Sequence, residues 1–250
     1  MGRLVRDYRN VRRGGRVEGG LARSEANGRF VPMANAGFWV VFEGADGVGK
    51  TTQIDLLAGY LRGPAGGGRD VVTTREPGGT PLGVELRQAI MHGDHVAPRA
   101  EALLYAADRA HHIATLVRPA LEAGAVVVQD RYLDSSVVYQ GGARGLGEEV
   151  ERISLWATEG LLPDLTIVLD MAPDAARVSR DLDRVERETI AKAAQMRAGF
   201  LARAELDPGR YAVVDAARSI DTVHGSVVAA VLERLPGLAA GMGIEPWGTP

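Results

Sequence analysis

The chain has 250 residues, 46% of them hydrophobic, so it is long enough to bury one sizeable core. Its formal net charge of -3 gives no strong field for nucleic acid or for an anionic membrane, and we expect neither partner. The sequence contains no cysteine, which excludes disulfides, thiolate metal sites and a cysteine nucleophile and fits a cytoplasmic location. No apolar run approaches the roughly 20 residues that a transmembrane helix needs.

Residues 1–36 differ in composition from the rest of the chain. They contain eight arginines, three acidic residues and few apolar side chains, which predicts a disordered N-terminal extension. A nucleic-acid-binding arm is the alternative, but no aromatic side chains alternate with the arginines to stack on bases. The segment lacks the apolar stretch of a secretory signal. A further hypothesis is that the natural start is Met33, just before the first predicted strand.

From residue 37 the sequence alternates between short apolar runs and longer segments of helical character. We predict strands at 38–43, 70–74, 125–130, 165–170 and 211–215. We predict helices at 50–61, 82–91, 99–123, 148–159, 174–180, 189–205 and 220–234. Most strand runs are rich in Val and Ile without polar alternation, as in parallel strands covered on both faces. This predicts one α/β domain over 37–235, a doubly wound five-stranded parallel sheet flanked by helices, followed by a loose tail at 236–250.

A glycine-rich stretch, FEGADGVGKTTQ at 42–53, follows the first predicted strand and opens the first predicted helix. It fits the phosphate-binding pattern Gly44-x-x-x-x-Gly49-Lys50-Thr51 in the context that the pattern requires. In such loops backbone N–H groups converge on phosphate oxygens, the lysine reaches the β- and γ-phosphates and the hydroxyl binds Mg²⁺. A glycine-rich turn is the alternative, but the chain has only two lysines among 29 basic residues, which argues against a chance match. We therefore expect ATP to be held by Gly44, Ala45, Asp46, Gly47, Val48, Gly49, Lys50, Thr51 and Thr52.

Charged residues gather where the second and third strands are predicted to end. TREPGGTPLGVELRQ (74–88) brings Arg75, Glu76 and Arg87 to one end, and the third strand runs into Asp130 and Arg131. Ligands of a doubly wound sheet bind at this edge. An aspartate there suits Mg²⁺ held through water, and an arginine suits a phosphate. A tight turn and a surface ion pair would also explain these motifs.

Two side chains in LLYAADRAHH (103–112) share one helix face. Tyr105 and Arg109 are four residues apart, so they are neighbours on a helix. They form either a core aromatic with its capping cation or a base-stacking ring beside a hydrogen-bonding guanidinium. His111 and His112 are expected on the helix surface or in helix packing, without a catalytic role.

Together, several segments resemble the motifs of bacterial thymidylate kinases in the same order, over about residues 38–234. They are FEGADGVGKTTQ, TREPGGTPLG, LLYAADRAHHI, QDRYLDSSVVYQGGARGL, LLPDLTIVLD and DLDRVERE, of which DRYLDSSVVYQG and REPGGT are the most specific. The resemblance implies a nucleoside monophosphate kinase fold with a short lid at about 178–188. It implies a Mg²⁺-dependent homodimer that phosphorylates dTMP to dTDP with ATP. Another P-loop small-molecule kinase and a non-catalytic ATP-binding homologue remain the alternatives.

The same resemblance implies a role for individual side chains. It implies that dTMP is bound by Asp46, Glu76, Pro77, Arg87, Tyr105, Arg109, Arg131, Ser136 and Gln140. It implies that Lys50, Asp130, Arg131, Arg180 and Arg184 act in phosphoryl transfer. Metal would be held by Thr51, by Asp130 through water, and by Glu76 as a further candidate. Pro77 is by resemblance a candidate for a cis peptide bond.

The P-loop itself contains no arginine, and family members of this kind carry catalytic arginines in the lid. Candidates here are Arg177, Arg180 and Arg184, of which Arg184 fits the family pattern best. The alternative is a solvated helix face in which Arg177 and Arg184 pair with Asp181 and Glu188 four residues on.

Overall fold

The computed structural model describes residues 21–23, 30–32, 37–93, 96–172 and 192–235. The chain divides into two units, Met1–Ala36 and Gly37–Pro250. In the first unit, the described strands β1 (Leu21–Arg23) and β2 (Phe30–Pro32) pair antiparallel. The predictions for 1–36 as a disordered extension and for 236–250 as a loose tail stay predictions.

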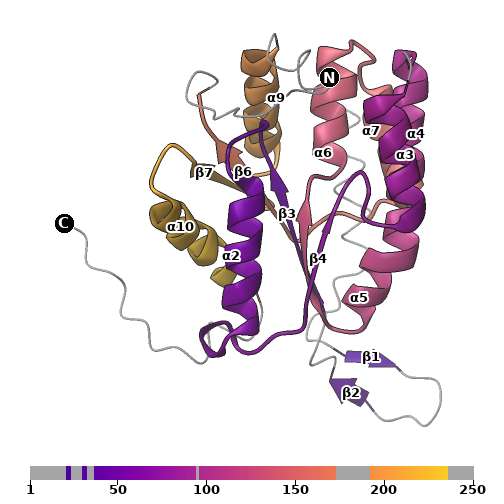
Figure 1. Cartoon of the computed structure of the whole chain (residues 1–250). Coiled ribbons are helices and arrows are strands. Elements are labelled where there is room, and N and C mark those ends of the chain that lie inside the picture. Colours follow the sequence, from indigo (N-terminus) through magenta and orange to yellow (C-terminus); the bar gives the residue numbers. More distant parts are fainter. Residues whose placement is uncertain (1–20, 24–29, 33–36, 94–95, 173–191, 236–250) are drawn as a thin grey trace. The chain divides into compact units, whose positions relative to one another are not determined.

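The second unit is built on a five-stranded parallel sheet with the strand order β4-β5-β3-β6-β7 (Figure 1). The strands are β3 (Phe38–Glu43), β4 (Val71–Arg75), β5 (Val126–Asp130), β6 (Leu165–Asp170) and β7 (Tyr211–Asp215). All neighbouring pairs are parallel. The predicted doubly wound sheet is therefore confirmed, and each strand lies within one residue of its predicted bounds.

Helices connect the strands and cover both faces of the sheet. They are α2 (Lys50–Arg62), α3 (Pro81–His92), α4 (Pro98–His112), α5 (Arg118–Glu122), α6 (Leu133–Ser136), α7 (Glu149–Ala157), α9 (Ala193–Leu206) and α10 (Ile220–Leu232). π-Helical segments at Ile113–Val117 and Val137–Ala143 continue α4 and α6. The predicted helix at 99–123 is thus one helical run with a π-helical interior, whereas the run from α6 onward was not predicted. The predicted helix at 174–180 lies outside the described residues.

Side-chain caps mark where two of these helices begin. The Thr80 hydroxyl accepts a hydrogen bond from Gly83 N at the start of α3, where Pro81 takes the first helical position. Ser219 accepts in the same way from Thr222 N at the start of α10. Caps of this kind satisfy backbone N–H groups that the first helical turn leaves without a partner.

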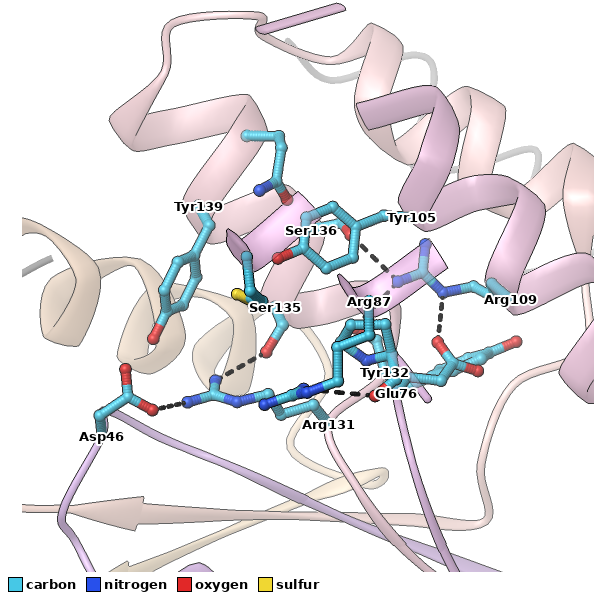
Figure 2. Close-up of a pocket in the computed structure, with 13 residues that line it drawn as sticks. Asp46, Glu76, Arg87, Tyr105, Arg109, Arg131, Tyr132, Ser135, Ser136 and Tyr139 are labelled. Atoms are coloured by element: carbon cyan, nitrogen blue, oxygen red, sulfur yellow. Dashed lines mark hydrogen bonds and ion pairs between the residues drawn. The ribbon is translucent and has the colours of Figure 1, made fainter. Parts of the chain in front are cut away.

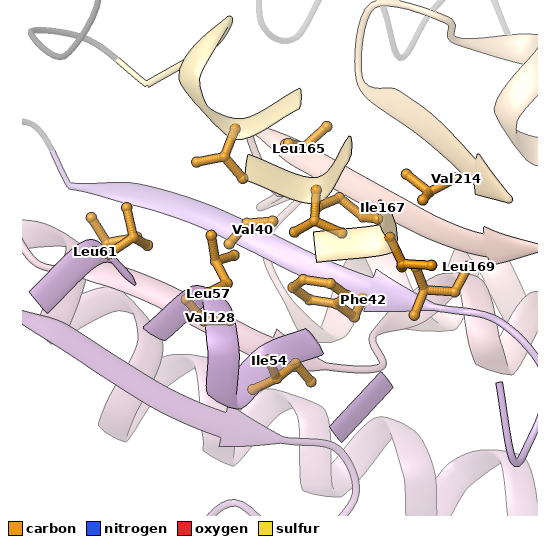
Figure 3. Packing of buried hydrophobic residues seen from close by; sticks show 14 of the residues in the cluster. Val40, Phe42, Ile54, Leu57, Leu61, Val128, Leu165, Ile167, Leu169 and Val214 are labelled. Atoms are coloured by element: carbon orange, nitrogen blue, oxygen red, sulfur yellow. The ribbon is translucent and has the colours of Figure 1, made fainter. Parts of the chain in front are cut away.

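The central strand β3 sends alternate side chains into two separate cores. Phe38, Val40 and Phe42 pack with α2 and α10 on one face of the sheet (Figure 3). Trp39 and Val41 pack on the opposite face with the first π-helical segment. Because both faces are covered, an uninterrupted apolar strand is stable here. Within the described part of the chain, no helix has the length and apolar character needed to cross a bilayer.

The register of the sheet brings the candidate site together. Asp130, the last residue of β5, lies level with Phe42 of β3 and with Arg75 of β4. All three strands therefore end at one edge, where the loops after them meet.

Shortening a core side chain should destabilise this unit. Leu57 on α2 is fully buried, so Leu57→Ala should lower the free energy of unfolding by about 2–5 kcal/mol through lost burial and a new cavity. Urea denaturation followed by circular dichroism measures this. Leu56→Ala, one residue earlier and 37% exposed, is the control and should change stability by at most about 0.5 kcal/mol. Equal effects of the two substitutions would contradict the assigned packing.

Candidate active site

The loop between β3 and α2 has the backbone of an anion cradle. Gly44, Gly47 and Gly49 have φ values of 136°, 79° and 95°, which side chains rarely allow. A Cβ on Gly44 would also lie 2.6 Å from the backbone oxygen of Leu169. Lys50 Nζ donates across the loop to the backbone oxygens of Gly44 (3.1 Å) and Ala45 (2.8 Å). The nine predicted ATP-binding residues all lie on this loop or in the first turn of α2.

The buried ammonium group of Lys50 lies in an environment that disfavours its charge. Burial, and secondarily the positive charge of Arg131, lower the pKa of Lys50 to about 8, against the opposing effect of Asp130 and Asp46. An anion bound in the loop would reverse this, because it would stabilise the charged form. The loop is therefore built to receive negative charge.

A cavity opens beside this loop at the carboxyl edge of the sheet (Figure 2). It is lined by all nine residues that sequence analysis assigned to dTMP: Asp46, Glu76, Pro77, Arg87, Tyr105, Arg109, Arg131, Ser136 and Gln140. Four lining residues were not predicted: Met91, Tyr132, Ser135 and Tyr139. Tyr139 could have been found as the helical neighbour, three residues on, of the predicted Ser136. The structure thus brings together side chains from five separate segments of the sequence.

The guanidinium of Arg109 is enclosed at one end of the cavity. Arg109 is 1% exposed, and its Nε donates to Glu76 Oε2 at 2.8 Å. Its terminal nitrogens donate to Ser154 Oγ at 2.9 Å and to Ser136 Oγ at 3.0 Å. A buried charge needs such a carboxylate and such acceptors to be tolerated. The structure places both Tyr105 and Arg109 at the cavity wall. This favours the interpretation as ligand-binding side chains over the one as a core aromatic with its capping cation.

The second oxygen of Glu76 is held by a histidine. His112 Nδ1 lies 2.9 Å from Glu76 Oε1, and His112 Nε2 lies 2.7 Å from Thr74 Oγ1. His112 is fully buried, so the expected helix packing holds for it, with the added effect of orienting Glu76. Both carboxylate oxygens are engaged, which favours a positioning role for Glu76 over metal binding. The Glu76–Pro77 peptide bond is cis, as the resemblance implied.

Arg131 joins the P-loop to the helical run after β5. Its Nη2 donates to Asp46 Oδ1 at 2.5 Å and its Nη1 to Ser135 Oγ at 3.0 Å. The guanidinium lies 5.3 Å from the centre of the Tyr139 ring, within range of a cation–π contact. Arg131 has a φ of 64°, uncommon for a residue with a side chain and frequent at functional sites.

Glu43, the last residue of β3, holds the segment around Arg131 in place. It was not predicted as a site residue. Its carboxylate accepts from Tyr132 N (2.8 Å), Ser135 N (3.1 Å) and Ser135 Oγ (2.7 Å). Burial and the nearby charge of Asp134 raise the pKa of Glu43 to about 7. The available signal was a glutamate that ends an otherwise apolar strand. Glu43 fixes the segment that carries Arg131 against the P-loop.

Asp130 carries an oxygen suited to a hard cation. Among the described residues, its Oδ1 is buried without a hydrogen-bond partner, an unusual state for a carboxylate oxygen. Carboxylate and hydroxyl oxygens are the protein ligands that Mg²⁺ accepts, often with water and phosphate completing its shell. Asp130 and the exposed Thr51 therefore fit a metal ion that arrives with a nucleotide. Within the described ranges, no cluster of three or more His, Cys, Asp or Glu side chains could hold a metal.

The P-loop and the cation-lined cavity share one edge of a parallel sheet and are joined by the Arg131–Asp46 pair. This is the arrangement of a P-loop kinase, in which a phosphate donor and an acceptor lie side by side. Residues 42–227 match the family model described as thymidylate kinase. The chain belongs to the thymidylate kinase family.

Curated and solved relatives agree with this assignment. The chain is 53% identical over 198 residues to the thymidylate kinase of Clavibacter michiganensis subsp. michiganensis, covering 76% of this chain and 92% of the relative. It is 54% identical over 205 residues to that of Leifsonia xyli subsp. xyli, covering 79% and 95%. The crystal structure of the Ehrlichia chaffeensis thymidylate kinase matches with a TM-score of 0.66 and 28% identity, over 78% of this chain and 99% of that one. The predicted nucleoside monophosphate kinase fold is confirmed.

The predicted lid at about 178–188, with Arg177, Arg180 and Arg184, lies outside the described residues. Its assignment stays a prediction.

The lowered pKa of Lys50 predicts that ATP binding takes up a proton at alkaline pH. Below about pH 8 the ammonium is already charged; above it, bound phosphates should restore the charge. Calorimetry of ATP binding in buffers of different ionisation enthalpy should show uptake near zero at pH 7 and approaching about one proton at pH 9. Lys50→Arg, whose side chain stays charged, should show no uptake from this position. Equal uptake at pH 7 and pH 9 in the parent would contradict the assignment.

Proposed function

We propose that this chain transfers the γ-phosphoryl group of ATP to the 5′-phosphate of dTMP, giving ADP and dTDP. The observation that carries the proposal is the cavity beside the P-loop, lined by all nine residues assigned to dTMP. No observation favours a different acceptor or a non-catalytic homologue. A cytoplasmic location belongs to the same proposal, because the donor is ATP and a chain without cysteine suits a reducing compartment.

The reaction needs positioning and charge stabilisation more than proton transfer. An oxygen of the dTMP phosphate is already anionic at neutral pH, so it can attack the γ-phosphorus without a general base while the bond to the β-phosphate oxygen breaks. Lys50 would stabilise charge on the transferred group and on ADP. Arg131 and Arg87 would hold the acceptor phosphate in line.

The opposite end of the cavity would read the base. Tyr105 would stack on thymine, while Arg109, Ser136 and Gln140 would offer polar groups to its edge. Pro77, with Glu76 behind it, would form part of the wall. Asp46 would approach the sugar, so that the P-loop touches both substrates.

Mg²⁺ would be held by Thr51 directly and by Asp130 through water. When bound, the ion would supply positive charge that neutralises part of the negative charge of the phosphates. Glu76 is less suited, since Arg109 and His112 already occupy its oxygens. Arg180 and Arg184 of the lid would add positive charge at the γ-phosphate, with Arg184 as the first choice.

A homodimer is also part of the proposal. The neighbouring helices α3, α4 and α7 lie together on one side of the sheet (Figure 1) and carry large exposed apolar side chains. These are Leu82 and Val84 on α3, Leu103 on α4 and Trp156 on α7, the last 83% exposed. An indole left in water at this extent is typical of an interface anchor. A second copy of the chain packed on these helices would bury it.

A coupled assay of ADP release with dTMP, dUMP, dCMP, dGMP and AMP tests the reaction directly. We expect Mg²⁺-dependent turnover with dTMP above the other acceptors. Lys50→Ala should lower the rate about a hundredfold, from a loss of about 3 kcal/mol of transition-state stabilisation. No turnover of the parent with dTMP would overturn the proposed function.

Sedimentation velocity tests the dimer. Trp156→Glu would bury a charge at the proposed interface, so it should convert the dimer to a monomer. Leu206→Glu is the matched control: Leu206 is 54% exposed at the end of α9, outside this face, and its variant should stay dimeric. A parent that sediments as a monomer would contradict the proposal.

A further inference from the structure

A buried carboxylate behind the cavity has no role in the chemistry proposed so far. Glu101 lies in the first turn of α4, is 1% exposed and does not line the cavity. It accepts a hydrogen bond from Gln140 Nε2 at 3.0 Å. It also accepts from Arg144 Nε at 3.3 Å and Nη2 at 3.2 Å, as an ion pair. Burying a carboxylate costs free energy unless hydrogen-bonding partners compensate it. One of the partners of Glu101, Gln140, is itself a lining residue of the cavity.

The chemistry of this contact fixes which way the Gln140 amide points. An ionised carboxylate, as the ion pair with Arg144 requires, can only accept hydrogen bonds. Gln140 must therefore turn its NH₂ group toward Glu101. A glutamine amide has nearly the same shape when rotated by 180°, so without such a partner its oxygen and nitrogen could exchange places.

The location of Gln140 makes this orientation matter for ligand binding. Gln140 is 2% exposed and lines the cavity together with Tyr105 and Arg109. Glu101, Tyr105 and Arg109 follow one another at intervals of four residues, so they share one face of α4. Gln140 reaches the first of these from the π-helical segment Val137–Ala143. The carboxylate thus stands one helical turn from the ring proposed to stack on the base.

We propose that Glu101 is a positioning residue that fixes the polarity of the Gln140 amide and so makes the cavity selective for a base with a ring N–H. The inference rests on the proposed function and deepens it. With its NH₂ group committed to Glu101, Gln140 keeps its oxygen as an acceptor for the N3–H of thymine. Cytosine carries an unprotonated acceptor at N3, and two acceptors facing each other in a buried site repel.

The magnitude follows from the cost of an unsatisfied buried polar group. That cost corresponds to a factor of about 10 to 100 in selectivity for dTMP over dCMP. If the Gln140 amide were free to rotate, it could satisfy either base and most of this selectivity would be lost. Arg144 contributes by holding the carboxylate in place. A purely structural role for Glu101 would instead affect stability and both substrates alike.

Glu101→Gln tests this, because it keeps the shape but can present either an oxygen or a nitrogen to Gln140. We expect KM for dTMP to rise about tenfold and the ratio of kcat/KM for dTMP over dCMP to fall about tenfold. KM for ATP and kcat at saturating dTMP should stay within about twofold. Glu149→Gln is the control, since Glu149 is an exposed carboxylate paired with Arg152 and should change none of these values. Glu101→Met, which removes the acceptor, should lower the ratio as well and serves if Glu101→Gln fails to fold.

A double-mutant cycle with Gln140→Ala shows whether Glu101 acts through Gln140. In the Gln140→Ala background, Glu101→Gln should leave the dTMP to dCMP ratio unchanged, because there is no amide to orient. An unchanged ratio in Glu101→Gln, or a second full loss in the double variant, would overturn the inference while dTMP phosphorylation by the parent stands. A parent without activity on dTMP would instead overturn the proposed function and the inference with it.

Discussion

The buried guanidinium of Arg109 is the constraint around which the acceptor cavity is arranged. An arginine stays charged when it leaves water, so its burial requires a carboxylate and a set of acceptors at fixed positions. Glu76 after β4, Ser136 on α6 and Ser154 on α7 supply them, and each comes from a different part of the sequence. The ion pair with its hydrogen bonds therefore ties three separate segments to α4, and two of them line the cavity. A side chain held this way loses little further freedom when a ligand binds.

At the end of the cavity beside the P-loop, positive charge is compensated in a different way. Lys50 donates to two backbone oxygens rather than to a carboxylate, and Arg131 lies close enough to lower the pKa of Lys50 further. Arg131 forms its ion pair with Asp46, which is itself a residue of the P-loop. Positive charge at this end is thus compensated less completely than at Arg109. An anionic group would complete the compensation here. Around Arg109 the charge is already matched, so shape and hydrogen bonding remain to select a ligand at that end of the cavity.

The sequence predicts most of this architecture because the strands and the P-loop are local patterns. β3, β6 and β7 have their predicted bounds, since an apolar run between turn residues needs no knowledge of distant contacts. The nine cavity residues came from resemblance to a family, since local patterns left their roles open. Glu43 and Glu101 were missed for a physical reason: their partners Ser135 and Gln140 are 92 and 39 residues away. Burial of a carboxylate becomes visible only when the chain has folded.

The π-helical segment Val137–Ala143 links the two ends of the cavity. Its wider turn is seen where Arg144 N donates to Tyr139 O, five residues back, at 2.9 Å. Tyr139 lies against the guanidinium of Arg131 beside the P-loop, and the next residue, Gln140, donates a hydrogen bond to Glu101 on α4. Under the proposed function, these two successive residues would serve the phosphate site and the base site respectively. π-Helical turns are rare and are frequently found at functional sites, and the contacts of Tyr139 and Gln140 agree with such a location.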